Sequence, residues 1–150
     1  NDALTVCDQH WLARWLLNRV CEDYGVQPSF ENKPIKGDWN GAGQHTNFST
    51  AQMRNPETGR DAIEGAIGRL AEKHSEHITA YGAGLEQRLT GLHETCSIKE
   101  FRSGVADRGC SIRIPRAVAD KGYGYIEDRR PGANIDPYLV CSKIYETSCL

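Results

Sequence analysis

Residues 110–115 read CSIRIP, in which three apolar residues alternate with two polar ones ahead of a proline. Side chains on a β-strand point alternately to the two faces of a sheet, so this pattern predicts a strand with one buried and one polar face. A second strand of this kind is expected over residues 123–128. Further strand-like segments are predicted over residues 26–30, 41–50 and 88–95.

Three segments show the three- and four-residue spacing of apolar side chains that indicates a helix with one buried face. They cover residues 8–24, 60–81 and 137–147. Gly82 is the expected C-cap of the second helix, and Asp136, before a proline, is the expected N-cap of the third. Because strands and helices mix without regular βαβ alternation, the sequence predicts an α+β fold with a largely antiparallel sheet and flanking helices.

The bulk composition fits one globular domain. The 150 residues are 39% apolar and 25% charged, and the net charge is -2. A weakly acidic chain supplies no general positive field, which argues against a nucleic-acid partner. No apolar run approaches the ~20 residues of a membrane helix, so no membrane partner is expected. The chain lacks an initial Met and a basic N-terminal region, which indicates a fragment or a processed product without a signal peptide.

Six cysteines allow either a disulfide framework or free thiols. The chain is long enough to be stabilised by its core alone, and it carries no secretory signal, so reduced and mostly buried thiols are the favoured interpretation. No Cys-x-x-Cys pair occurs, which leaves a zinc site poorly supported.

Arginines are concentrated in the second half of the chain, within or beside the strand-like segments. A guanidinium group offers a planar fork of donors to carboxylate and phosphate oxygens, as phosphoryl transfer requires. The alternative is a solvated, charged face of the sheet. The arginines concerned are Arg88, Arg102, Arg108, Arg113, Arg116, Arg129 and Arg130.

Three further residues are candidates for chemistry. Glu94 follows a stretch that contains a glycine, so it can close over a substrate as an acid, a base or an ammonium ligand; the alternative is a surface carboxylate. Glu127 can hold a hard metal ion beside an arginine if it points inward, or it can simply neutralise its basic neighbours. His45 follows small residues that let a ligand approach the backbone, although a lone histidine is more often a core residue. His74 and His77 are expected to be packing residues of their helix.

Four motifs, in the order and at the spacing of the family, resemble those of glutamine synthetase of the eukaryotic type, and the resemblance covers nearly the whole chain. They read DWNGAGQHTNFST at residues 38–50, RLTGLHET at 88–95, GVADRGCSIR at 104–113 and YIEDRRP at 125–131. The resemblance implies an ATP-dependent ligase that joins ammonia to glutamate through a γ-glutamyl phosphate intermediate. It also implies Mg²⁺ or Mn²⁺ as the metal, a homo-oligomeric ring and a cytoplasmic location.

The resemblance also implies individual roles for residues of these motifs. The catalytic residues would be Glu94, Arg108 and Arg129. The substrate-binding residues would be Trp39, Asn40, Gly41, His45, Arg88, Arg108 and Arg129. The ATP-binding residues would be Asn47, Phe48, Ser49, Arg108, Arg113 and Tyr125, and the metal ligands would be His45 and Glu127.

Gln44 and Asp107 depart from the residues that the family more often has, and the length departs further. Residues 1–150 are expected to form part of the catalytic domain, without the N-terminal strand domain and without most of the metal-binding glutamates. The chain alone is therefore expected to be inactive. Two alternatives stay open: a non-catalytic binding or structural descendant of the family, and a related carboxylate–amine ligase.

Overall fold

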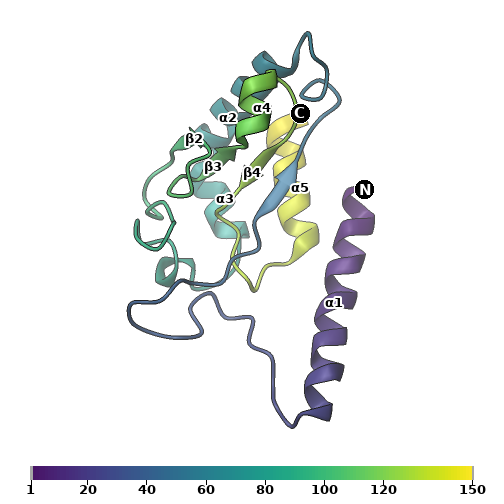
Figure 1. The fold of residues 1–150 in the computed structure, drawn as a ribbon, viewed down its shortest axis with the longest axis vertical. Coiled ribbons are helices and arrows are strands. Elements are labelled where there is room, and N and C mark those ends of the chain that lie inside the picture. The colour runs from purple at the N-terminus through teal and green to yellow at the C-terminus, as the bar shows by residue number, and fades with distance from the viewer. Residues whose placement is uncertain (1, 150) are drawn as a thin grey trace.

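The computed structural model describes residues 2–149, which form a small sheet flanked by helices (Figure 1). The helices are α1 (Ala3–Asp23), α2 (Gly59–Glu72), α3 (His74–Ala80), α4 (Arg116–Lys121) and α5 (Pro137–Cys149), with a 3₁₀ turn at Leu85–Gln87. The strands are β1 (Thr46–Phe48), β2 (Ser103–Val105), β3 (Ile112–Ile114) and β4 (Ile126–Asp128).

The four strands pair in the order β1-β4-β3-β2. The β1–β4 and β3–β4 pairs are antiparallel, whereas β2 and β3 run parallel. The sheet is therefore mixed but mostly antiparallel, which confirms the α+β fold expected from the sequence. In register, Asn47 and Arg113 both lie opposite Glu127, while Phe48 lies opposite Ile126.

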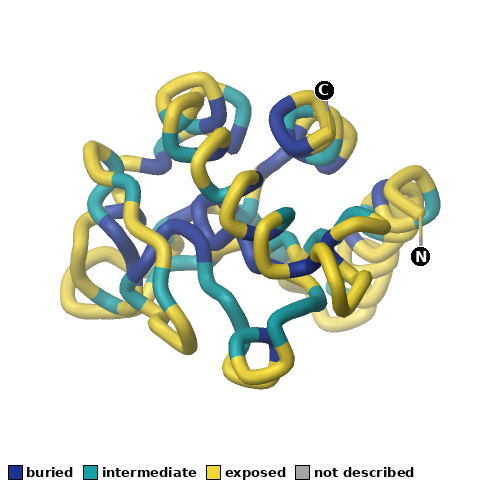
Figure 2. Tube along the Cα trace, turned by 90° about the horizontal axis from the view of Figure 1, so that it is seen from above, coloured by how far each residue is buried: buried dark blue, intermediate teal, exposed yellow. Residues whose placement is uncertain are grey.

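This register divides the sheet into an apolar and a polar face. Ile112 and Ile126 are fully buried and pack against the apolar side chains of α2, among them Leu70. A second cluster joins Tyr81 to α5, and Phe48 packs against both clusters. Buried segments accordingly lie in the centre of the molecule (Figure 2). The opposite face, which carries Glu127, is left for polar side chains.

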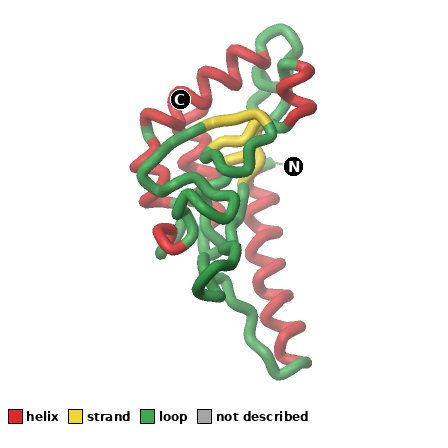
Figure 3. The backbone as a smooth tube through the Cα atoms, turned by 60° about the vertical axis from the view of Figure 1, so that its left-hand side comes forward, coloured by secondary structure: helices red, strands yellow, loops and turns green. Residues whose placement is uncertain are grey.

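Helix α1 extends beside this body and leads into a long loop that returns to β1 (Figure 3). Asp2 is its N-cap, and its side chain accepts a hydrogen bond from Thr5 N at 2.9 Å. The helix therefore begins at Ala3, five residues before the predicted start at residue 8. Its apolar stripe, which includes Trp15, is exposed, because only Cys7 and Arg14 face the body closely enough to be buried.

The second predicted helix is divided into two. Lys73 is the C-cap of α2 and the N-cap of α3, with φ −98° and ψ 18°, which interrupts the regular helix. The C-cap of α3 is Tyr81 rather than the predicted Gly82, which follows one residue later with φ 105°, a conformation that glycine adopts without strain. Asp136 accepts hydrogen bonds from the backbone N–H groups of Tyr138 and Leu139, as its predicted N-cap role requires.

Two predicted strands are wrong. Residues 26–30 form no strand, because they lie in the loop that connects α1 to the body. Residues 88–95 form turns, since Gly91, His93 and Glu94 all have positive φ, and only one isolated bridge, between Thr90 and Ser97, occurs there. The predicted strands at 41–50, 110–115 and 123–128 are present but shorter. Three elements were not predicted: the 3₁₀ turn at Leu85–Gln87, β2 and α4.

The six cysteines are free thiols, as expected, but only three are buried. Cys21 and Cys141 are partly buried, and Cys149 is exposed. Within residues 2–149, no helix is long and apolar enough to cross a membrane.

Candidate functional site

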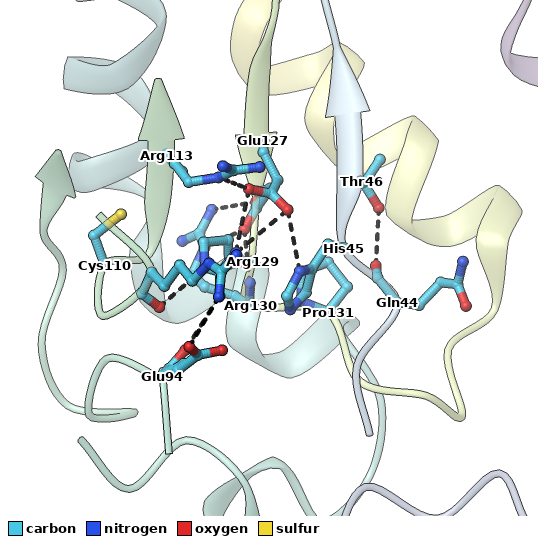
Figure 4. Close-up of polar contacts among 12 residues, drawn as sticks. Gln44, His45, Thr46, Glu94, Cys110, Arg113, Glu127, Arg129, Arg130 and Pro131 are labelled. Carbon is cyan, nitrogen blue, oxygen red and sulfur yellow. Dashed lines mark hydrogen bonds and ion pairs between the residues drawn. The ribbon is translucent and has the colours of Figure 1, made fainter. Parts of the chain in front are cut away.

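Glu127 lies at the centre of the polar face of the sheet, with side chains from three elements directed at it (Figure 4). Its Oε1 lies 3.1 Å from His45 Nδ1, at the start of β1. Its Oε2 accepts a hydrogen bond from Arg113 Nε on β3, and Arg129 Nη1 donates to both carboxylate oxygens at 3.3 and 3.4 Å. One buried carboxylate is thus shared by two guanidinium groups and an imidazole.

The electrostatics of this group follow from burial and charge. Burial would raise the pKa of Glu127, but the Arg113 hydrogen bond and the charge of Arg129 hold that pKa below its ordinary value. Burial, with the positive charge of Arg129, lowers the pKa of His45 in spite of Glu127. At neutral pH the carboxylate is therefore ionised and the imidazole neutral, which leaves the cluster with net positive charge.

Arg129 connects this cluster to two loops. Its Nε donates to the Arg108 carbonyl and its Nη2 to the Glu94 carbonyl, both at 3.2 Å. The side chain is only 8% exposed, so its orientation is fixed by contacts on three sides. Glu127 and Arg129, two residues apart, lie on the same face and are in direct contact.

Arg88 reaches the same region from the 3₁₀ turn. Its Nη2 donates to three backbone carbonyls, those of Arg129, Arg130 and Pro131, at 2.6–3.1 Å. Burial, with the neighbouring charge of Arg129, lowers the pKa of Arg88 to about 10. A second buried cation close to Arg129 is unfavourable unless an anion compensates both.

The glycines of the GAG motif make room for Arg88. A Cβ at Gly41 would lie 2.5 Å from Arg88 Cγ, and a Cβ at Gly43 would lie 2.9 Å from Arg88 Nη1 and 3.2 Å from His45 Nε2. Any larger residue would therefore displace the guanidinium. The sequence suggested that a ligand approaches this backbone; the structure shows that a guanidinium group of the chain itself already does so.

A cleft of about 380 Å³ opens over these groups. It is lined by six of the predicted site residues, namely Asn40, Gly41, His45, Arg88, Glu94 and Arg129, together with Ala42, Gly43, His93 and Thr95. Trp39, predicted to bind substrate, is 61% exposed and does not line this cleft. His93 was not singled out; its Nε2 lies 3.3 Å from Asp38 Oδ1.

Glu94 stands at the rim of the cleft on a strained turn. His93 and Glu94 have φ values of 53° and 60°, a region in which side-chain-bearing residues are uncommon. The Glu94 side chain is about half exposed and pairs with exposed Arg108 across 3.2 Å. This pair joins two loops at the surface, and it is the part of the site with the fewest buried contacts.

The residues predicted to bind ATP gather in a different cleft. A cavity of about 560 Å³ lies between β1, α1 and α5, and Asn47, Phe48, Ser49 and Tyr125 line it. Arg54, which the sequence argument missed, also lines it and donates to the Ser49 carbonyl and hydroxyl at 2.9 and 2.8 Å. Its position five residues after Ser49 was the available signal. Arg108 and Arg113 line neither cleft; Arg113 stands beside Glu127 instead.

The described residues fit a divalent metal only in part. His45 and Glu127 offer one imidazole nitrogen and one carboxylate within 3.1 Å of each other. Among residues 2–149, no group of three or more His, Cys, Asp or Glu side chains gathers. A six-coordinate Mg²⁺ or Mn²⁺ would need further oxygen ligands from substrate phosphates, water or other carboxylates.

Comparison of the sequence with known proteins shows which family the chain resembles. The family model described as "Glutamine synthetase, catalytic domain" matches residues 1–148. Glutamine synthetase of Yarrowia lipolytica is 57% identical over 148 residues, which is 99% of this chain and 40% of that protein. The Saccharomyces cerevisiae enzyme is 59% identical over 142 residues (95% and 38%), and that of Amanita muscaria 58% over 149 residues (99% and 42%). The chain spans about 40% of the length of these curated relatives.

Proposed function

The chain belongs to the glutamine synthetase catalytic-domain family, and from that premise we propose that it supplies part of the active site of an ATP-dependent glutamate–ammonia ligase. In the proposed reaction, the side-chain carboxylate of glutamate takes the terminal phosphoryl group of ATP. Ammonia then displaces phosphate from the γ-glutamyl phosphate and yields glutamine.

One observation carries this proposal. Two buried guanidinium groups, those of Arg88 and Arg129, border the 380 Å³ cleft, and the nearest buried carboxylate is already shared with Arg113. The cleft therefore has an excess of fixed positive charge in a partly desolvated setting. Carboxylate and phosphoryl groups are the ligands that a cleft lined by guanidinium groups binds best.

The residues of the cleft would have different roles in the reaction. Arg88 and Asn40 would bind glutamate at one end of the cleft. Arg129, held by Glu127 and by two loop carbonyls, would face the oxygen atoms of the phosphoryl group in transfer, where a preorganised donor lowers the barrier. Glu94 would close from its exposed turn to bind ammonium and take up a proton.

His45 and Glu127 would hold one metal ion, as two of its ligands. A bound Mg²⁺ or Mn²⁺ supplies Lewis-acid neutralisation of phosphate charge. The nucleotide itself would extend toward the second cleft, along Asn47, Ser49 and Tyr125, with Arg54 as an additional cation there. Arg113 and Arg108 would approach its phosphates from the side of β3.

We further propose that residues 1–148 act as a part of the catalytic domain, in a homo-oligomeric ring whose other segments complete the metal site. The relatives' greater length supports this, since each has more than half of its residues outside the matched region. The cytoplasmic location expected from the sequence stays a prediction.

The test is a chimera. Residues 1–148 replace the matching segment of the Yarrowia lipolytica enzyme, and phosphate release is measured with glutamate, ammonia and Mg-ATP. We expect release that depends on both glutamate and ammonia, at a rate within about tenfold of the host enzyme. The 150-residue chain alone should show none, because its two metal ligands cannot neutralise the phosphates.

The alternatives give different results in the same assay. A non-catalytic descendant would give a folded, assembled chimera without turnover. A related ligase would release phosphate with glutamate only when another amine replaces ammonia. Either result would overturn the proposal.

A further inference from the structure

Two cysteines on different helices bring their sulfur atoms together where α1 meets α5. The Sγ atoms of Cys7 and Cys141 lie 3.6 Å apart, although the residues are 134 positions apart in the chain. A disulfide needs a sulfur–sulfur distance of about 2.05 Å, so the two atoms must approach by about 1.5 Å. Small rotations of two side chains supply movements of this size without unfolding either helix.

The two thiols differ in access. Cys7 is 1% exposed, and its burial, together with the Cys141 contact, raises the pKa of its thiol. Cys141 is partly buried and lines the open cleft of about 560 Å³ between β1, α1 and α5. A small reagent in solution therefore meets Cys141 first. Cys7 is almost fully buried and lies directly against Cys141.

The surrounding contacts keep the helices in place around this pair. Tyr138 on α5 donates a hydrogen bond to Asp8 at 2.5 Å, one residue from Cys7. Arg14 donates to the carbonyls of Ala133 and Ile135, just before α5, at 2.7 and 2.8 Å. These contacts fix the two helices on either side of the thiols. Apart from them, α1 is exposed over most of its length and joins the body through a long loop (Figures 1 and 3).

We propose that Cys7 and Cys141 form a reversible thiol–disulfide site that covalently ties α1 to α5, with Cys141 as the attacking thiol and Cys7 as the resolving thiol. The oxidant is a low-molecular-weight disulfide of the glutathione class. The site is separate from the residues assigned to glutamate and metal binding, and the proposal does not rest on the proposed function.

The chemistry balances in two exchanges. The Cys141 thiolate attacks one sulfur of glutathione disulfide, which forms a mixed disulfide and releases one glutathione thiolate. The Cys7 sulfur then attacks the Cys141 sulfur, gives up its proton to the departing second glutathione, and closes the Cys7–Cys141 bond. Two protein thiols are oxidised and one glutathione disulfide is reduced to two thiols. Dithiothreitol reverses both steps.

The expected consequence is a fixed position for α1. The bond closes a loop that spans most of the chain, and such a cross-link restricts the unfolded state more than a short one does. The oxidised protein should therefore unfold at a higher temperature than the reduced protein.

The test uses the complete 150-residue chain and glutathione disulfide. After incubation, remaining thiols are alkylated under denaturing conditions, and disulfide-linked peptides are mapped by mass spectrometry. We expect a disulfide-linked peptide pair that contains Cys7 and Cys141, besides any glutathione adduct on exposed Cys149, and a melting temperature raised by roughly 5–10 °C. Mixed disulfides alone, or a first cross-link at another cysteine pair, would overturn the proposal.

Three variants separate the roles of the thiols. Cys7→Ala should stop at a glutathione adduct on Cys141, and Cys141→Ala should form neither the adduct at this site nor the cross-link. Cys149→Ala is the matched control, because Cys149 lies on the same helix, borders the same cleft and is exposed. It should retain the cross-link. A Cys7→Ala variant in which Cys141 still forms an intramolecular disulfide would refute the pairing.

A second probe covers the case in which removal of buried Cys7 prevents folding. Phenylarsine oxide binds two thiols held close together and needs no oxidant. The reduced wild-type chain should bind one equivalent at these two cysteines, as peptide mapping will show, and the Cys149→Ala variant should do the same. Failure of the folded wild-type chain to bind it there would count against a paired site whatever the variants do.

Discussion

Strand β4 and the two residues after it carry two acid–arginine pairs, one on each side of the sheet. Glu127 and Arg129 lie on the polar face, where Arg129 lines the cleft, whereas Asp128 and Arg130 lie on the side of the helices. On the inner side, Asp128 accepts hydrogen bonds from Arg130 at 2.8–2.9 Å and from the Tyr81 hydroxyl at 2.7 Å. Both members of that pair are at most 1% exposed.

The pairs have the same chemistry but different balances of charge. Asp128 and Arg130 neutralise each other, and the guanidinium group also lies 5.2 Å from the ring centres of Tyr81 and Phe101. Glu127 is instead shared between Arg113 and Arg129, which leaves positive charge for a ligand. A satisfied pair stabilises a fold, while an unbalanced pair at a cleft is available for binding.

The largest expected effect breaks the inner pair. Asp128→Asn removes the charge that compensates buried Arg130, which should lower the free energy of unfolding by about 3–5 kcal/mol. Glu127→Gln is the matched change on the outer side. It leaves buried Arg129 without its carboxylate, but Arg129 keeps two carbonyl acceptors and Arg113 is partly exposed, so the cost should be smaller, about 2 kcal/mol. Urea unfolding of both variants measures the difference. Equal losses would show that the two faces are not distinct in this sense.

Acid should act mainly on the inner network. His77 is fully buried between Tyr81 and Thr147, and burial, with the charge of Arg130, lowers its pKa from 6.5 to about 4. Between these pH values the unfolded chain binds the proton and the folded chain does not. Stability is therefore fully present above about pH 6.5 and falls by about 3 kcal/mol as the pH approaches 4.

The groups that face His77 include Asp128, Arg130, Lys143 and Glu76. The pKa of Asp128 is itself lowered, so its own contribution is lost only below its ordinary value of 3.8, outside this window. Urea unfolding at pH 7, 6, 5 and 4.5 gives the slope. His77→Gln should flatten it, whereas His45→Gln on the outer face should leave most of it. An unchanged slope in His77→Gln would contradict the assignment.

On the outer side, the comparison is tested by turnover. In the Yarrowia chimera, Arg129→Lys keeps the charge but loses the fork that reaches Glu127 and two loop carbonyls, so kcat/KM should fall about a hundredfold. Arg102→Lys is the control, since Arg102 is exposed and lies outside the cleft; it should stay within a few-fold. A control that loses as much activity as Arg129→Lys would remove the special role of Arg129.

Sequence periodicity predicted this alternation but not its consequence. The two-residue spacing correctly places Glu127 and Arg129 together, and it equally implies that Arg130 faces the other way. From the spacing alone, a substitution of Arg130 would be expected to have little effect on activity. The structure shows instead that it is 1% exposed and paired with Asp128, because residues far away in the chain, Tyr81 and Phe101, enclose it.

The same distinction explains the other errors. Helices with strong periodicity were found, but the break at Lys73 and the exposed stripe of α1 depend on tertiary contacts that no local pattern contains. The false strand at 88–95 has only two apolar residues, Leu89 and Leu92, which are three positions apart, and its turns appear in the positive φ angles of residues 91, 93 and 94. The motifs contain most of the residues of the candidate site, whereas the place of Trp39 outside the cleft and that of Arg54 in the second cleft depend on how the loops fold.

The smallest expected effect concerns the room that glycine leaves for Arg88. In Gly43→Ala, the new Cβ would lie 2.9 Å from Arg88 Nη1, so the guanidinium group must shift by a few tenths of an ångström. Since Arg88 is proposed to bind glutamate, KM for glutamate should rise about tenfold in the chimera, equivalent to about 1.4 kcal/mol, with kcat within a few-fold.

Gly68→Ala is the matched control, because nothing lies within 4 Å of its Cβ and it sits in α2, where alanine should add about 0.5–1 kcal/mol of stability. Steady-state kinetics with varied glutamate, together with urea unfolding, separate the two variants. If Gly43→Ala leaves KM unchanged, Arg88 does not contact glutamate from its present position, and the outer pair rather than Arg88 must carry the recognition of the substrate carboxylate.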